Sequence, residues 1–173
     1  MTHDRKDGQT HLKDEARTPP CLFKNLDNRF HFDLDVACTK ENCLSRNGYG
    51  YTSGDNALIQ DWTRFMMDNG EEASSFFCNP PYSNPAPFIV KSYIESLKGA
   101  TVVMLLPSDT STKSFHEYCM KASEIIFLHP RVIFNNPDGT PIKGSPKFGS
   151  MVVVFKQDYF DGSPVISSMN WKS

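Results

Sequence analysis

Apolar residues along the chain gather in short runs separated by polar segments, and these runs predict the strands of a sheet. The longest, TVVMLLP from Thr101 to Pro107, is typical of a strand covered on both faces. Three shorter runs predict further buried strands, at residues 76–78, 125–128 and 150–155. We expect the last of these to pair antiparallel with the strand that precedes it.

One further segment, from Phe30 to Cys38, alternates apolar with polar residues. Alternation of this kind predicts a strand with one buried and one polar face. Asp33 and Asp35 fall on the polar face. On this pattern alone, two ordinary aspartates on a solvent-facing edge are favoured over a ligand site.

Segments with helical periodicity lie between the strands. Thr18, followed by two prolines, has the signals of a helix start. Residues 55–62 and 85–97 predict two more helices. Their core-facing side chains are expected to be Leu58, Ile59 and Trp62 in the first, and Phe88, Ile89, Tyr93, Ile94 and Leu97 in the second. Strands that alternate with helices indicate an α/β fold with a mostly parallel central sheet.

The length of 173 residues and the hydrophobic content of 39% fit one folded domain. We expect it to cover residues 18–173, with a disordered tail at residues 1–17, where large apolar side chains are nearly absent. No apolar stretch approaches a membrane span and no signal peptide is recognisable, so a cytoplasmic protein is expected. Five cysteines without a CxxC pair, and scattered histidines, favour reduced thiols and no metal.

The net charge of −2 gives no general sign of nucleic-acid binding. A local basic surface remains open, because lysine and arginine outnumber aspartate from Arg131 onward. Within that part, the polar loop 135–148 contains Lys143 and Lys147. A loop of this length is usually either functional or disordered, and both readings stay open.

The sequence Asn79-Pro80-Pro81-Tyr82 follows the strand at 76–78 and carries the clearest chemistry in the chain. The two prolines stop the strand and hold the backbone stiff and extended. The Asn79 side-chain oxygen and the Pro80 carbonyl can then point the same way as acceptors, beside the flat ring of Tyr82. Such a set suits a planar exocyclic amine, which needs positioning more than a strong base. A rigid turn without chemistry is the simpler alternative.

Asn-Pro-Pro-Tyr resembles the catalytic motif of the S-adenosylmethionine-dependent amino methyltransferases, which act on nucleobases or on protein glutamine. Further segments in a matching order make the chain, from about Thr18 to Phe155, similar to the phage-type DNA N6-adenine methyltransferases of the Dam family. These segments are Thr18-Pro19, residues 33–37, Ala57-Leu58 with Asp61-Trp62, residues 106–108 with Phe115-His116, Arg131 with Phe134, and Gly149-Ser150. The resemblance implies a class I, Rossmann-like methyltransferase fold with a C-terminal antiparallel hairpin. It also implies S-adenosylmethionine as methyl donor and double-stranded DNA as the partner.

By the same resemblance, Asn79 and Pro80 hold the adenine N6 amine, Pro81 completes the motif, and Tyr82 stacks on the extruded base. Phe134 is expected to cover the other face of that base. The candidates for the donor site are Asp33, Asp35, Ala37, Thr18, Asp55 and Ala57. DNA contacts are expected from Arg131, Lys143, Lys147, Ser108 and His116. The glycine-rich first motif of larger methyltransferases is absent from the sequence.

Two alternatives to this function stay open. The first is an amino methyltransferase that carries the same four residues but acts on RNA or on protein glutamine. The second is a catalytically inactive relative that only binds DNA. The family resemblance further implies a phage or prophage role, either in protection from restriction or in regulation.

Overall fold

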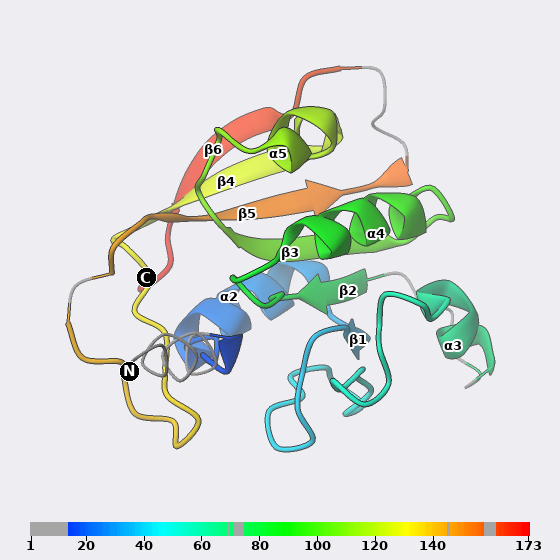
Figure 1. Ribbon diagram of the computed structural model, residues 1–173, viewed down its shortest axis with the longest axis horizontal. Helices are drawn as coiled ribbons and strands as arrows, with labels where there is room; N and C mark the ends of the chain where they lie inside the picture. The colour runs from blue at the N-terminus through cyan, green and yellow to red at the C-terminus, as the bar shows by residue number, and fades with distance from the viewer. Residues whose placement is uncertain (1–13, 69, 71–74, 145, 158–161) are drawn as a thin grey trace, which may run out of the picture.

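A computed structural model describes residues 14–173, apart from 69, 71–74, 145 and 158–161 (Figure 1). Its strands form one six-stranded sheet in the order β1-β2-β3-β5-β4-β6. They are β1 (Leu34–Asp35), β2 (Ser75–Cys78), β3 (Thr101–Pro107), β4 (Glu124–His129), β5 (Ser150–Phe155) and β6 (Val165–Asn170). Parallel pairing joins β1 to β2, β2 to β3, and β4 to β6. Strand β5 runs antiparallel between β3 and β4.

Helices cover both faces of this sheet, so the fold has three layers (Figure 1). The helices are α2 (Pro20–Phe30), α3 (Trp62–Asp68), α4 (Ala86–Ser96) and α5 (Lys113–Glu117), followed by the short 3-10 helix η1 (Cys119–Lys121). Strand β3 divides its side chains between the layers, as a strand must. Val103 and Leu105 pack with α2, whereas Met104 and Leu106 pack on the opposite side with α4 and α5.

The mixed α/β fold predicted from the sequence is confirmed. The buried strands at 101–107 and 150–155 are present, and a helix begins directly after Pro19. The antiparallel pairing of β5 with β4 was also predicted, but β5 pairs with β3 as well and therefore lies inside the sheet. Strand β6 was not predicted. It pairs parallel with β4 at the edge, and nearly all of its side chains are exposed.

The long strand predicted from Phe30 to Cys38 is reduced to two residues, and Asp35 of its expected polar face is buried. Phe30 ends helix α2, and only Leu34 and Asp35 belong to β1. Asp35 is 3% exposed. The segment around Gly50 covers it, because Asp35 N donates to Tyr49 O and Tyr51 N donates to Asp35 O. A loop that returns to cover a strand edge leaves no trace in the periodicity of that strand.

Two predicted helices differ from the observed ones. Residues 55–61 form turns, and helix α3 begins at Trp62 instead of ending there. Trp62 is buried as expected, but Ile59 is 76% exposed. Helix α4 matches residues 85–97 closely, although Ile94 and Leu97 lie at its exposed side instead of in the core.

The predicted disordered tail covers residues 1–17, of which 1–13 lie outside the described residues. Residues 14–17 contact the folded domain. Arg17 pairs with Asn135 through two backbone hydrogen bonds of 2.8 and 2.9 Å. Among the described residues, no helix has the length and apolar character needed to cross a membrane.

Candidate active site

Two cavities lie beside each other where β1 and β2 end, and Asn79 lines both of them. The larger has a volume of about 780 Å³ and lies beside the residues that follow β1. The smaller has a volume of about 280 Å³ and lies between Tyr82 and the loop 135–148. Ligands of open α/β sheets bind at the carboxyl ends of parallel strands, and both cavities open there.

Asn79 is held in place by the sheet and by Thr18. It directly follows Cys78, the last residue of the buried strand β2, so its backbone is fixed by the sheet. Its Nδ2 donates to Thr18 Oγ1 over 3.2 Å. Its Oδ1 is buried and accepts no hydrogen bond from the described residues. Because buried polar atoms are normally paired, this oxygen is marked as an acceptor for a ligand.

Tyr82 presents an aromatic surface to the smaller cavity. Its hydroxyl is buried without a hydrogen-bond partner among the described residues. Burial raises the pKa of this phenol above its ordinary value, and the nearby Ser150 hydroxyl offsets the increase only in part. Tyr82 therefore stays neutral, and its ring is available for stacking rather than for proton transfer.

Phe134 and Phe148 complete the aromatic wall of the smaller cavity. The Phe134 ring meets Tyr82 edge to face, with centroids 5.5 Å apart and planes at 81°. The Phe148 ring is tilted by 48° to Tyr82, with centroids 6.1 Å apart. Tyr82 and Phe134 are thus direct neighbours, and a base cannot lie between them unless one ring moves. Phe148 is 51% exposed, so of the three rings it is the one that a base stacking on Tyr82 displaces at least cost.

Asp35 is the buried carboxylate of the larger cavity. Its Oδ1 accepts from Ala37 N and its Oδ2 from Leu44 N, each over 3.2 Å. Burial nevertheless raises the pKa of Asp35 to about 7, because two neutral donors offset only part of the desolvation. A carboxylate in this state favours a cationic ligand, which would stabilise its ionised form.

The segment before α2 lies where the two cavities meet. Asp14 accepts from Ser83 N over 3.0 Å and from Ser83 Oγ over 2.7 Å. Asp14 and Ala16 line both cavities. The loop that follows Tyr82 is therefore tied to a segment far away in the sequence.

Many of the site residues predicted from the sequence come together around these cavities. The larger cavity is lined by Thr18, Asp35, Ala37, Ala57, Asn79 and Pro81. The smaller is lined by Asn79, Pro80, Tyr82, Phe134, Lys143 and Lys147. Lys143 and Lys147 both come from the long loop, so this loop contributes directly to the site.

Other predicted residues do not line either cavity. Asp33 lies at the start of the ladder, where its carboxylate accepts from Ser75 N. Asp55 caps a turn by accepting from Thr52 N and Oγ1. Arg131 donates to Pro146 O and so stabilises the long loop without lining a cavity itself. Ser108 packs against Gly149, and His116 lies exposed on α5.

Asp14, Cys38 and Phe148 are among the site residues that the sequence analysis missed. Asp14 lies in a polar stretch without periodicity, and its hydrogen bond from Ser83 is what brings it to the site. Phe148 is a lone aromatic in a polar loop, next to the strand β5. Its position directly before Gly149-Ser150 was the one available signal.

Comparison with known proteins assigns the chain to the family that its sequence motifs resemble. The chain matches the family described as DNA N-6-adenine-methyltransferase (Dam) over residues 6–172. It is 34% identical over 149 residues to the DNA N-6-adenine-methyltransferase of Haemophilus phage HP1 (strain HP1c1), which covers 83% of this chain and 79% of that protein. It is 30% identical over 118 residues to the DNA N-6-adenine-methyltransferase of Escherichia phage T1, which covers 68% of this chain but only 45% of that protein. With both cavities inside the matched residues, the chain belongs to the DNA N-6-adenine-methyltransferase (Dam) family.

Proposed function

We propose that this chain transfers the methyl group of S-adenosylmethionine to the N6 amine of an adenine that has been turned out of double-stranded DNA. Methylation of adenine in DNA is the reaction of the family. To this reaction the proposal adds the identity of the methyl donor, the extrusion of the base and the roles of individual residues. The fold proposed with them is that of a class I, Rossmann-like methyltransferase, supported by parallel strands β1, β2 and β3 with cavities at their carboxyl ends.

The observation that carries the proposal is the buried, unpartnered Oδ1 of Asn79 at the junction of the two cavities. An amino methyltransferase has to hold an amine next to a methyl donor. Asn79 lines both cavities, and its bond to Thr18 engages Nδ2 and leaves the acceptor Oδ1 unpaired among the described residues. An sp² amine that donates to this oxygen is fixed in position, and methyl transfer depends mainly on such positioning.

The larger cavity fits the methyl donor. Its volume of about 780 Å³ is that of an ordinary small-molecule site, which spans roughly 300–1,000 Å³. S-adenosylmethionine carries an ammonium and a sulfonium, and the buried Asp35 carboxylate is a suitable partner for the ammonium. The walls around Asp35 mix apolar groups such as Val36 and Phe88 with the hydroxyls of Thr39 and Thr52. These residues fit a molecule with both a polar tail and a flat nucleoside.

The smaller cavity fits the target base. Tyr82, Phe134 and Phe148 supply aromatic surface, and Pro80 lies beside Asn79 at the wall that the cavities share. A base inside a duplex cannot reach this depth, so the adenine has to be extruded, which costs a few kcal/mol. Lys143 and Lys147 lie at the same cavity, where their ammonium groups are suited to the flanking phosphates.

During the reaction, the residues of the site position the amine and stabilise its charge. When bound, the donor supplies an electrophilic methyl group. Asn79 Oδ1 and the Pro80 carbonyl accept the two N6 hydrogens, which directs the nitrogen electron pair toward the larger cavity. Positive charge grows on N6 as the new bond forms, and the two oxygens stabilise it without reorganising. N6 then loses a proton to water, because Tyr82 stays neutral and is not a base.

Transfer of a labelled methyl group tests the substrate class. Purified protein is incubated with methyl-labelled S-adenosylmethionine and, separately, with double-stranded DNA, RNA and a protein extract. We expect label in DNA, as N6-methyladenine. Label confined to RNA or to protein glutamine would contradict the proposal and support an amino methyltransferase of another specificity.

Calorimetric titration of the protein with the donor alone tests the second alternative. The proposal requires binding, and Asp35→Asn should weaken it, because the substitution removes the charge that pairs with the ammonium. Absence of any donor binding by the folded wild-type protein would favour a relative that occupies DNA without methylating it.

A further inference from the structure

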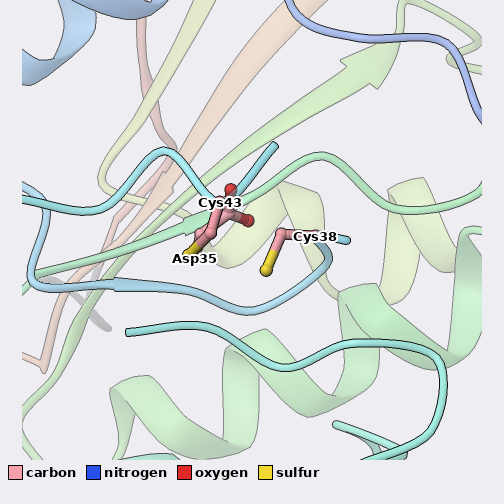
Figure 2. A group of neighbouring side chains, drawn as sticks. All are labelled: Asp35, Cys38 and Cys43. Carbon is pink, nitrogen blue, oxygen red and sulfur yellow. The ribbon is translucent and has the colours of Figure 1, made fainter. Parts of the chain in front are cut away.

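Two cysteines and a carboxylate converge where β1 runs into the following loop. They are Asp35, at the end of β1, and Cys38 and Cys43, which come from the loop (Figure 2). One ligand atom from each of the three residues lies within 4.8 Å of the others. Asp35 and Cys38 are buried, and Cys43 is half-buried. The methyl-transfer reaction proposed above gives the two sulfur atoms no role.

Gly50 makes room for the two sulfur atoms. A side chain at this position would place its Cβ 2.3 Å from Cys38 Sγ and 2.5 Å from Cys43 Sγ. Non-bonded contacts this short essentially never occur at a Cβ atom, so any side chain at this position would force the thiols to shift. The backbone pairing of this segment with Asp35 therefore brings the thiols together at a site that glycine keeps open.

The cluster is acidic and has no built-in counterion. Among the described residues, no lysine, arginine or histidine pairs with Asp35, Cys38 or Cys43. Each Asp35 oxygen accepts only one backbone N–H and keeps capacity for another partner. A cation would satisfy all three groups at once.

We propose that Asp35, Cys38 and Cys43 bind a thiophilic divalent cation, with Zn²⁺ as the best match. Two thiolates and a carboxylate are an accepted ligand set for Zn²⁺, which is four-coordinate and takes water where protein ligands are missing. Binding forms two S–Zn bonds and one O–Zn bond, and the thiol protons leave to solvent. The ion would fasten the loop 39–50 to the end of β1. Asp35 and Cys38 both line the larger cavity, so the ion would lie at the wall of the proposed donor site, using one Asp35 oxygen and leaving the other for the ammonium of the donor.

A disulfide between the two cysteines is the competing chemistry. It needs an external oxidant, such as a small-molecule disulfide, and it makes no use of Asp35. The position of the carboxylate within ligand distance of both sulfur atoms favours the metal.

Titration with Zn²⁺ alone tests the site. Protein is first treated with reductant and chelator, freed of both without oxygen, and titrated against a chromogenic chelator. We expect one equivalent of Zn²⁺ to bind, and Cys38→Ser and Cys43→Ser each to weaken binding by about 100-fold or more, since loss of a supporting outer group alone costs 10- to 100-fold. Cys21→Ser, which removes an exposed thiol elsewhere, should bind as the wild type does.

Titration with Co²⁺ gives an independent readout, because thiolate ligands produce a charge-transfer absorption. The wild type and Cys21→Ser should show it, and Cys43→Ser should show it at reduced intensity. If Cys38→Ser fails to fold, as judged by circular dichroism, the half-buried Cys43 still carries the test. Equal Zn²⁺ affinity in all variants, or a Cys38–Cys43 disulfide in a protein that binds no Zn²⁺ after reduction, would overturn the proposal. The metal titrations contain neither the methyl donor nor DNA. A negative result in them would therefore overturn the metal site without contradicting the proposed methyl-transfer function.

Discussion

At the scale of single residues, we propose that the Thr18 hydroxyl sets which end of the Asn79 carboxamide meets the substrate. Asn79 Nδ2 donates to Thr18 Oγ1, which leaves Oδ1 as the unpaired atom of the carboxamide among the described residues. A carboxamide that turned over would present N–H groups to an amine that itself donates. Under the proposed function, Thr18 is a positioning residue for Asn79, in addition to lining the larger cavity.

Replacement of Thr18 separates this role from simple packing. Thr18→Val keeps the shape but removes the acceptor, and we expect kcat for DNA methylation to fall about tenfold, which corresponds to ~1.4 kcal/mol, the scale of one hydrogen bond. Thr18→Ser keeps the hydroxyl and should retain most of the rate. Steady-state kinetics with saturating donor makes the comparison. If the valine and serine variants have equal kcat, Thr18 does not orient Asn79.

At the scale of elements, the sheet positions the site and a buried ion cluster fixes helix α4 against α3. Glu95 of α4 is 0% exposed and binds Lys91 at 2.6 Å and Lys98 at 3.0 Å. The Thr63 hydroxyl of α3 donates to the same carboxylate over 3.2 Å. Lys98 also reaches Asp61, directly before α3. A buried carboxylate with several donors stabilises the fold only while the whole set is intact.

Removal of the Glu95 carboxylate should destabilise the protein without touching the cavities. We expect Glu95→Ala to lower the free energy of unfolding by about 2–4 kcal/mol, because Lys91 and Thr63 lose their partner. Glu117→Ala is the matched control, since its pair with Lys113 is exposed and worth at most ~1 kcal/mol. Urea unfolding at pH 7 measures both. Equal losses in the two variants would show that the buried cluster contributes nothing specific.

The elements show how far the sequence leads. Continuous apolar runs identify strands such as β3, because a strand covered on both faces cannot be mistaken for a surface segment. Strand β6 has the sequence VISSMN and is mostly exposed, so its pairing with β4 rests on backbone hydrogen bonds that no side-chain pattern reports. Asp35 was predicted to face solvent because the alternation of residues in its strand carries no information about the Gly50 segment. That segment is near in sequence and folds back to cover Asp35.

The Asn79–Tyr82 motif could be predicted from the sequence, whereas most residues that line the rest of the two cavities could not. Asn79 to Tyr82 was identified because two prolines fix the local backbone whatever surrounds it. Asp33 and Asp35 could not be told apart, since only tertiary contacts place Asp35 in the larger cavity and Asp33 against Ser75. Asp14 and Phe148 enter the site through long-range contacts, which local patterns do not encode.

At the scale of the whole molecule, a protein with a net charge of −2 has to bind DNA through a local basic surface. Lys143 and Lys147 are our candidates for it, because they line the smaller cavity on a loop that Arg131 stabilises through Pro146 O. The Arg17–Asn135 backbone pairing ties the other end of the same loop to the segment before α2. The loop is thus held in place at both ends around the proposed base site.

Replacement of both lysines should weaken DNA binding in a salt-dependent way. For Lys143→Ala with Lys147→Ala, we expect the slope of log affinity against log salt to become shallower by about 0.9 for each phosphate that the protein no longer neutralises. Lys113→Ala, on the exposed surface of α5, serves as the control and should leave the slope unchanged. Fluorescence anisotropy with a labelled duplex gives the slopes. An unchanged slope in the double variant would place the DNA on another face.

The central claim is that the Asn79 oxygen holds the amine that receives the methyl group. Its most direct test is sequencing of DNA from cells that express the wild type, Asn79→Ala or Asn84→Ala, with N6-methyladenine as the readout. Asn84 is exposed two residues after Tyr82 and controls for loss of a nearby carboxamide. We predict that Asn79→Ala lowers the methylation rate roughly 10²- to 10³-fold while the protein remains folded, and that Asn84→Ala methylates like the wild type. Full methylation by a folded Asn79→Ala variant would contradict the account.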